Sequence, residues 1–241
     1  MNRDAQISNA LFAPQRGRTS MTMTTITKRS PRSLAGISAL ALTIASVVLT
    51  SGAAAQANVS GSAFGALVKT PLITTQSPLA TLPAGGGMNQ GSALSFGVPN
   101  TLSSSWLTSI TTGAANNTAS SAQSTSEVES VNLLGGVITA DNVTAIASSY
   151  VNQSGRASDA SGSGFANLVV NGVAISATPA PNTRLALPGL GYVVLNEQIP
   201  SGDGVTSSGM TVNMIHVVLQ NALTGFQTGE VIVGSATSAV K

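Results

Sequence analysis

Residues 210–220, Met-Thr-Val-Asn-Met-Ile-His-Val-Val-Leu-Gln, form the longest β-branched and aliphatic run in the chain. Side chains alternate between the two faces of a strand, so the run can be divided by position. One face holds Val212, Met214, His216 and Val218, and the other holds Ile215, Val217 and Leu219. Because both faces are largely apolar, the run predicts a central strand that is buried on both sides.

The same composition extends through residues 58–241, where runs of Val, Ile and Thr are interrupted at short intervals by Gly, Pro and Asn. This pattern is typical of many strands joined by tight turns, and no segment shows an amphipathic helical period. Further strands are predicted at residues 105–111, 165–170, 173–176, 192–197 and 230–235. Asn171-Gly172 predicts a type I′ hairpin turn.

Two tracts rich in Ser, Ala, Thr and Asn, residues 111–126 and 148–164, carry few large apolar side chains. We expect flat, solvent-facing strands in the first tract. In the second we expect a mobile loop around residues 155–164.

A weak internal repeat suggests how the strands are organised. Residues 60–68 and 161–169 are identical at six of nine positions. We therefore predict two related units, residues 58–150 and 155–241, packed as two sheets of one antiparallel β-sandwich. A β-solenoid is the alternative fold, although the repeat of about 20–30 residues that it needs is missing from the sequence.

The first 57 residues have the three parts of a secretory signal peptide. A long basic region is followed by the apolar run 34–49 and then by small residues. Cleavage is expected after Ala55 or Ala57, with Ala57 preferred. An uncleaved anchor is the alternative, but the apolar run is shorter than the ~20 residues of a membrane span and contains polar residues. No membrane span is expected once the signal is removed.

Removal of the signal changes the charge balance. Residues 58–241 carry four cations against seven carboxylates, a formal charge of −3. No basic patch remains, so nucleic acid is not an expected partner. The chain has no Cys and one His, which excludes disulfides, thiolate chemistry and sites that need several His or Cys ligands.

Six segments, taken in order, resemble the choice-of-anchor P family of bacterial exported proteins. They are residues 131–141 (VNLLGGVITAD), 165–172 (FANLVVNG), 180–182 (APN), 187–189 (LPG), 194–197 (VLNE) and 212–217 (VNMIHV). The resemblance implies export and, in many members, tethering to the cell surface through variable C-terminal anchors; it implies no activity. After residue 234 this chain continues only to Lys241 and departs from the anchored pattern, so we expect free secretion or non-covalent retention.

Titratable residues offer little chemistry in this sequence. His216 is expected to be a buried, neutral, hydrogen-bonded imidazole, and a general base with an unrecognised Ser is the alternative. Glu127 and Glu129 share one strand face and are expected to be solvated. Calcium is the only metal considered, with Asp141, Asp159 and Asp203 as oxygen ligands in Gly-rich loops. No other cofactor is expected.

The few aromatic side chains are the remaining candidates for a binding site. Trp106 shares a strand face with Thr108 and Ile110. Trp106 and Tyr192 are expected in the core, while a sugar-stacking platform that also includes Tyr150 is the alternative.

Taken together, the sequence predicts a secreted or cell-surface protein of structural or adhesive type without catalytic activity. A glycan- or surface-polymer-binding module and a hydrolase are the alternatives.

Overall fold

A computed structural model describes residues 58–241 apart from 117–118 and 154, and these residues belong to one compact unit. The predicted signal peptide, with Ala55 and Ala57, lies outside the described residues. The described part consists of fourteen strands and contains no helix. Consequently it has no helix that is long and apolar enough to cross a membrane.

One sheet has six antiparallel strands and is called the six-stranded sheet below. Its order is β11 (Thr183–Leu187), β12 (Gly191–Ser201), β13 (Ser208–Gln220), β14 (Gln227–Val240), β1 (Val59–Lys69) and β2 (Thr74–Thr81). The longest predicted strand, residues 210–220, is confirmed as β13 in the middle of this sheet. Neighbours β12 and β14 pair with it along almost its whole length.

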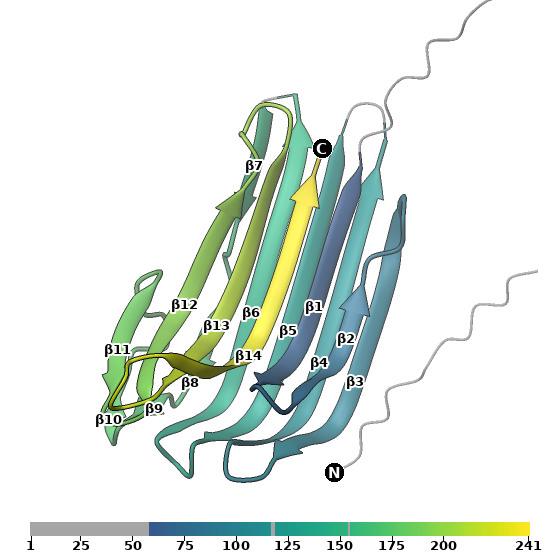
Figure 1. The fold of residues 1–241 in the computed structure, drawn as a ribbon. Helices are drawn as coiled ribbons and strands as arrows, with labels where there is room; N and C mark the ends of the chain where they lie inside the picture. Colours follow the sequence, from purple (N-terminus) through teal and green to yellow (C-terminus); the bar gives the residue numbers. More distant parts are fainter. Residues whose placement is uncertain (1–57, 117–118, 154) are drawn as a thin grey trace, which may run out of the picture. The chain divides into compact units, whose positions relative to one another are not determined.

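The other sheet has eight strands and is called the eight-stranded sheet. Its main path is β10 (Val173–Ala174), β9 (Val169–Val170), β6 (Ile138–Asn152), β5 (Ser120–Leu133), β4 (Leu102–Ala115) and β3 (Gly86–Val98). Two short strands, β7 (Gly155–Asp159) and β8 (Gly164–Ala166), also pair with β6. The two sheets lie face to face with their strands closely aligned (Figure 1).

The antiparallel all-β sandwich is therefore confirmed, and the alternative β-solenoid is wrong. Strands from both predicted units occur in both sheets, so the boundary between residues 58–150 and 155–241 does not separate the sheets. The predicted hairpin turn is confirmed, since Asn171 and Gly172 both have positive φ and join β9 to β10.

The polar tracts differ from expectation. The strands predicted in residues 111–126 are present as the end of β4 and the start of β5, but they are not solvent-facing on both sides, because Ser120, Ser124 and Ser126 point inward. The loop predicted around residues 155–164 is wrong in its first part, because residues 155–159 form β7 along β6. Small hydroxyl side chains can fill an inward position where two backbones lie close together, which composition alone does not reveal.

Long strands in both sheets shift their inward alternation once. In β13 the core-facing series runs through Val212 and then continues at Ile215 and Val217, a step of three residues instead of two. The same step occurs at 63–66 in β1, 104–107 in β4, 128–131 in β5, 140–143 in β6 and 233–236 in β14. Most of residues 210–218 are buried, as predicted, but the assignment of faces is wrong. Val212 and Val217 point inward, whereas His216 points outward.

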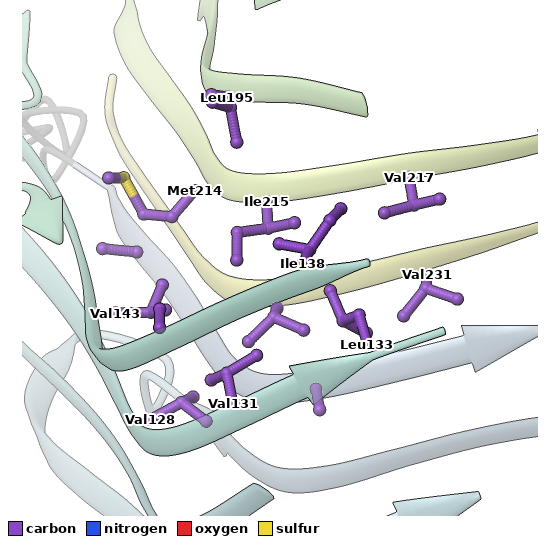
Figure 2. Packing of buried hydrophobic residues seen from close by; sticks show 14 of the residues in the cluster. Val128, Val131, Leu133, Ile138, Val143, Leu195, Met214, Ile215, Val217 and Val231 are labelled. Carbon is purple, nitrogen blue, oxygen red and sulfur yellow. The ribbon is translucent and has the colours of Figure 1, made fainter. Parts of the chain in front are cut away.

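A row of left-handed residues, which we call the crease, crosses the sheets at the level of the shift and has members in β4, β5 and β14. It comprises Trp106 (φ 48°), Ser130 (φ 52°), Asn167 (φ 50°), Asn196 (φ 50°) and Gly234 (φ 68°). One residue in this conformation adds a residue to the local repeat, so every later side chain moves to the other face. Figure 2 shows strands bending sharply beside Val128, Val131 and Val143, where the crease passes.

The core differs on the two sides of the crease. On one side, which we call the aliphatic half, large side chains such as Leu133, Ile138 and Ile215 are fully buried (Figure 2). On the other side, the serine half, many inward residues are small: Ala122, Ser124, Ala145, Ala147, Ser149, Ala236 and Ser238. Small side chains let the sheets approach, and the hydroxyls of Ser149 and Ser238 meet across them at 2.7 Å.

Candidate functional site

Trp106 does not lie in the core, and the prediction that placed it there is wrong: 61% of its surface is exposed. The pairing of β4 with β5 shifts between Ser103 and Ser105 and again between Ser105 and Leu107. Trp106 lies inside this double bulge in the left-handed conformation. Without the bulge, the alternation that buries Leu102 and Ser104 would also bury Trp106. The backbone therefore turns the indole ring outward.

Neighbouring strands surround the indole with a particular set of groups. Leu94 of β3 lies opposite Trp106, between the pairs 93–107 and 95–105, and is 71% exposed. Glu129 of β5 pairs with Ser105, immediately before Trp106, and is also exposed. An indole, an aliphatic side chain and a carboxylate thus lie close together on the outer face.

Amide and carboxylate groups continue from this point across the outer face. Asn142 donates a hydrogen bond to Glu127 Oε1 at 2.9 Å and accepts one from Thr144 Oγ1 at 2.8 Å. Beyond Asn142, Asn167 donates to Asp141 Oδ2 at 2.7 Å. The set formed by Trp106, Leu94, Glu129, Glu127, Asn142, Thr144, Asp141 and Asn167 is called the Trp106 strip below. Exposure of Glu127 and Glu129 agrees with the prediction that they are solvated.

Two hollows lie along the same outer face. An open hollow of about 410 Å³ borders the strip at Asn142 and Thr144 and is also lined by residues 162–166. A second cavity, of about 350 Å³, is lined by Tyr150, Gln123 and Thr112. Tyr150 is 41% exposed and lies nine residues beyond Asp141 on β6, about 30 Å at the rise of an extended strand. The face therefore offers aromatic rings at two widely separated points.

Tyr192 belongs to a different face. It lies on β12 of the six-stranded sheet and is half-buried. The Arg184 guanidinium lies 3.6 Å from its ring centroid, a cation–π contact that covers one face of the ring. The aromatic platform considered from the sequence is thus not assembled as a group of three.

His216 also lies on the outer face of the six-stranded sheet, between two carboxylates. Its Nδ1 is 2.9 Å from Glu197 Oε2 and its Nε2 is 3.5 Å from Glu230 Oε2. Glu197 also accepts from Asn213 at 2.7 Å, and Glu230 Oε1 lies 3.2 Å from Lys69 Nζ. Both ring nitrogens therefore face carboxylates instead of the serine hydroxyl that the hydrolase alternative requires.

The carboxylates change the charge expected for His216. The hydrogen bond to Glu197 raises the pKa of His216 above 6.5, burial opposes the rise, and attraction to Glu197 and Glu230 adds to it. The hydrogen bond with His216 lowers the pKa of Glu197 below 4.5. Burial opposes this decrease, and the hydrogen bond from Asn213 adds to it. The raised pKa favours a protonated imidazole paired with a carboxylate over the neutral imidazole expected from the sequence.

This pair predicts how stability depends on pH. Stabilisation by protonated His216 is complete below pH 6.5 and is lost as the pH rises through the raised pKa. Stabilisation by Glu197 is complete above pH 4.5 and is lost as the pH falls through the lowered pKa. We therefore expect the urea midpoint to be highest between pH 4.5 and 6.5 and to fall toward pH 9. His216→Gln should flatten the alkaline decline, and an unchanged decline in that variant would contradict the assignment.

The three aspartates considered for calcium lie in separate places and bind their own turns. Asp203 accepts from Thr206 Oγ1 and from the backbone N–H groups of residues 205–207, and these bonds hold the pKa of Asp203 well below its usual range. Asp159 accepts from Ser161 N–H, and Asp141 from Asn167. Within the described residues, no group of three or more His, Asp or Glu side chains is placed to hold a metal ion.

Comparison of the chain with protein-family models, with curated proteins and with solved structures finds no match.

Proposed function

We propose that the chain is an exported bacterial envelope or extracellular protein of structural or adhesive type, and that it binds an extended surface polymer, specifically a glycan, along the Trp106 strip. The observation that carries the proposal is the outward, left-handed Trp106 in its double bulge. Left-handed conformations are unfavourable for bulky residues and are found where the surrounding structure enforces them, often at functional sites.

The chemistry of the strip suits a sugar. The exposed indole offers an apolar ring face for stacking, and Leu94 extends that apolar surface. Carboxylates and amides beside it can bind hydroxyl groups, and several are already oriented by hydrogen bonds with one another. Pre-ordered polar groups lose little conformational freedom on binding, which favours affinity. The distance to Tyr150 suits an extended chain rather than a single small molecule.

Export is supported by the order of basic, apolar and small residues in the sequence of residues 1–57. A role in binding instead of catalysis is supported by the positions of the titratable groups. Hydrolysis of a glycan needs two carboxylates with distinct pKa values across the scissile bond. Glu127 and Glu129 project in the same direction from one strand, and both are exposed. His216 lies on the opposite sheet, within its own charge pair.

Trp106 is the only tryptophan in the chain, so its fluorescence reports directly on the strip. The full chain should be expressed with its leader, and the exported product identified by N-terminal sequencing, with Gln56 or Asn58 expected first. The fluorescence emission of Trp106 should shift when the exported product is titrated with soluble chito- and cello-oligosaccharides or peptidoglycan fragments. In affinity gels containing soluble glycans, Trp106→Ala should weaken binding at least about tenfold, as expected for loss of a stacked aromatic anchor.

Two further variants separate stacking from general effects. Trp106→Phe keeps an aromatic face and should retain part of the binding. Ile199→Ala removes an exposed apolar side chain from the six-stranded sheet and should leave binding unchanged. Equal binding by wild type and Trp106→Ala for every glycan tested would overturn the proposed site.

A further inference from the structure

The outer edge of β3 is open. β3 is the last strand of the eight-stranded sheet and pairs with β4 along Gly86–Val98 (Figure 1). Among the described residues no strand pairs with its other edge. The strand is thirteen residues long, and its sequence, GGMNQGSALSFGV, contains no charge and no proline. A long edge of this kind presents unpaired N–H and C=O groups that favour pairing with another strand.

The other sheet edges have features that discourage such pairing. β2 carries Pro78 in its middle, which has no N–H to donate. β11 has five residues and contains Arg184, whereas β7 has five residues and contains Arg156 and Asp159. β10 is only two residues long. Short strands, prolines and charges are the usual protection of an edge, and β3 has none of them.

Side chains along β3 are also incompletely covered. Its inward residues Ala93, Phe96 and Val98 pack against the core but remain only partly buried. Its outward residues Met88 and Leu94 are 61% and 71% exposed. A strand added beside β3 would cover both sets, in addition to pairing the backbone.

We propose that β3 pairs antiparallel with β3 of a second copy of this chain, forming a two-fold symmetric dimer with one continuous sheet. A two-fold axis brings the same strand of each copy together in the antiparallel direction. Because β3 carries no charge, identical strands meet without like-charge repulsion at the edge itself. The uncharged edge offers no charge complementarity that would select a strand of another protein. A second copy of β3, in contrast, has the same length as the edge and can pair along all of it.

The dimer does not depend on the proposed glycan, but it would change how that ligand is bound. Both copies of the Trp106 strip would lie on the same face of the continuous sheet. The two β4 strands would be separated by three strand spacings, about 14 Å. A polymer could then contact both strips at once, and the second contact would be intramolecular.

The absence of cysteine makes a direct test possible. Gln90→Cys, Ser92→Cys and Leu94→Cys, each introduced singly in the full chain, provide unique sites for spin labels. Light scattering of the exported product should give twice the monomer mass. In the dimer, the distance is measured between the label on one copy and the same label on the other. For each residue by which the labelled position is farther from the two-fold axis, this distance should grow by about 7 Å, because the label moves one residue rise along each of the two strands. A monomer at all concentrations, or distances that do not follow this order, would overturn the proposal.

A charge placed on the edge gives an independent test. Ser92→Lys with Leu94→Lys should weaken dimerisation at least about tenfold, since like charges would meet across the axis. Gln123→Lys, exposed on β5 away from the edge, is the matched control and should dimerise normally. Circular dichroism checks that each variant is folded. Trp106→Ala should still form the dimer, so loss of glycan binding and loss of self-association can be told apart.

Discussion

Replacing Gly234 with alanine is expected to lower the free energy of unfolding by about 2–5 kcal/mol. Gly234 lies in β14 at the crease with φ 68°, a conformation that costs L-residues about 1–2 kcal/mol. An added Cβ would also lie 2.9 Å from Val143 Cγ1 on the opposite sheet. Overpacking of this kind typically costs a further ~1–3 kcal/mol. Urea unfolding followed by circular dichroism measures the sum.

Gly135 provides the matched control for this prediction. It has the same φ of 68°, but a Cβ added there would have no neighbour within 4 Å. Gly135→Ala should therefore cost only the conformational part, about 1–2 kcal/mol. The difference between the two losses of unfolding free energy gives the cost of the steric contact between the sheets at the crease. Equal destabilisation by both would show that the sheets can separate there at no cost.

The crease links the stability of the sandwich to its candidate site. Four of its five members are not glycine, so their left-handed conformations are held by the pairing and packing of the strands around them. Trp106, Ser130 and Gly234 each lie within the three-residue step of their own strand, and these strands come from both sheets. One consequence is a change from large to small core residues; another is the outward placement of Trp106.

Local features of the fold could be predicted from the sequence. The strand at 210–220 and the hairpin turn at Asn171-Gly172 depend on neighbouring residues, and both are confirmed. The faces of β13 could not be predicted, because its alternation shifts between Val212 and Ile215, opposite Gly234 of the paired strand β14. Nothing within residues 210–220 marks that shift, and one such shift inverts the later faces. Asn favours the left-handed region, so Asn196 carries a weak signal, but Ser130 carries none, and both lie in the crease.

The candidate site shows the same limit. The sequence placed Trp106, Thr108 and Ile110 on one face, and the structure confirms that all three face outward. The choice between inside and outside failed because two of the three inward positions beside them, Ser109 and Thr111, are polar and only Leu107 is apolar. Leu94, Asn142 and Asn167 were missed entirely, since they meet Trp106 through strand pairings distant in the sequence.

The two halves of the core should respond in opposite ways to truncation. Leu133, in the aliphatic half, is fully buried among the large side chains of the main cluster. Leu133→Ala should lower the free energy of unfolding by about 2–5 kcal/mol, through lost burial and the cavity that remains. Ser124, in the serine half, is also fully buried, but its hydroxyl has no hydrogen-bond partner among the described residues. Ser124→Ala should therefore be neutral or stabilising by about 1 kcal/mol.

Ser149 shows whether the hydrogen bond decides the sign. Its burial resembles that of Ser124, but its hydroxyl meets that of Ser238 across the sheets at 2.7 Å. Ser149→Ala leaves the Ser238 hydroxyl buried without this partner and should destabilise by about 1–3 kcal/mol. Urea unfolding of the three variants at one pH would give the ranking. A destabilisation at Ser124 as large as that at Ser149 would mean that close packing of the hydroxyl itself stabilises the serine half, independently of hydrogen bonding.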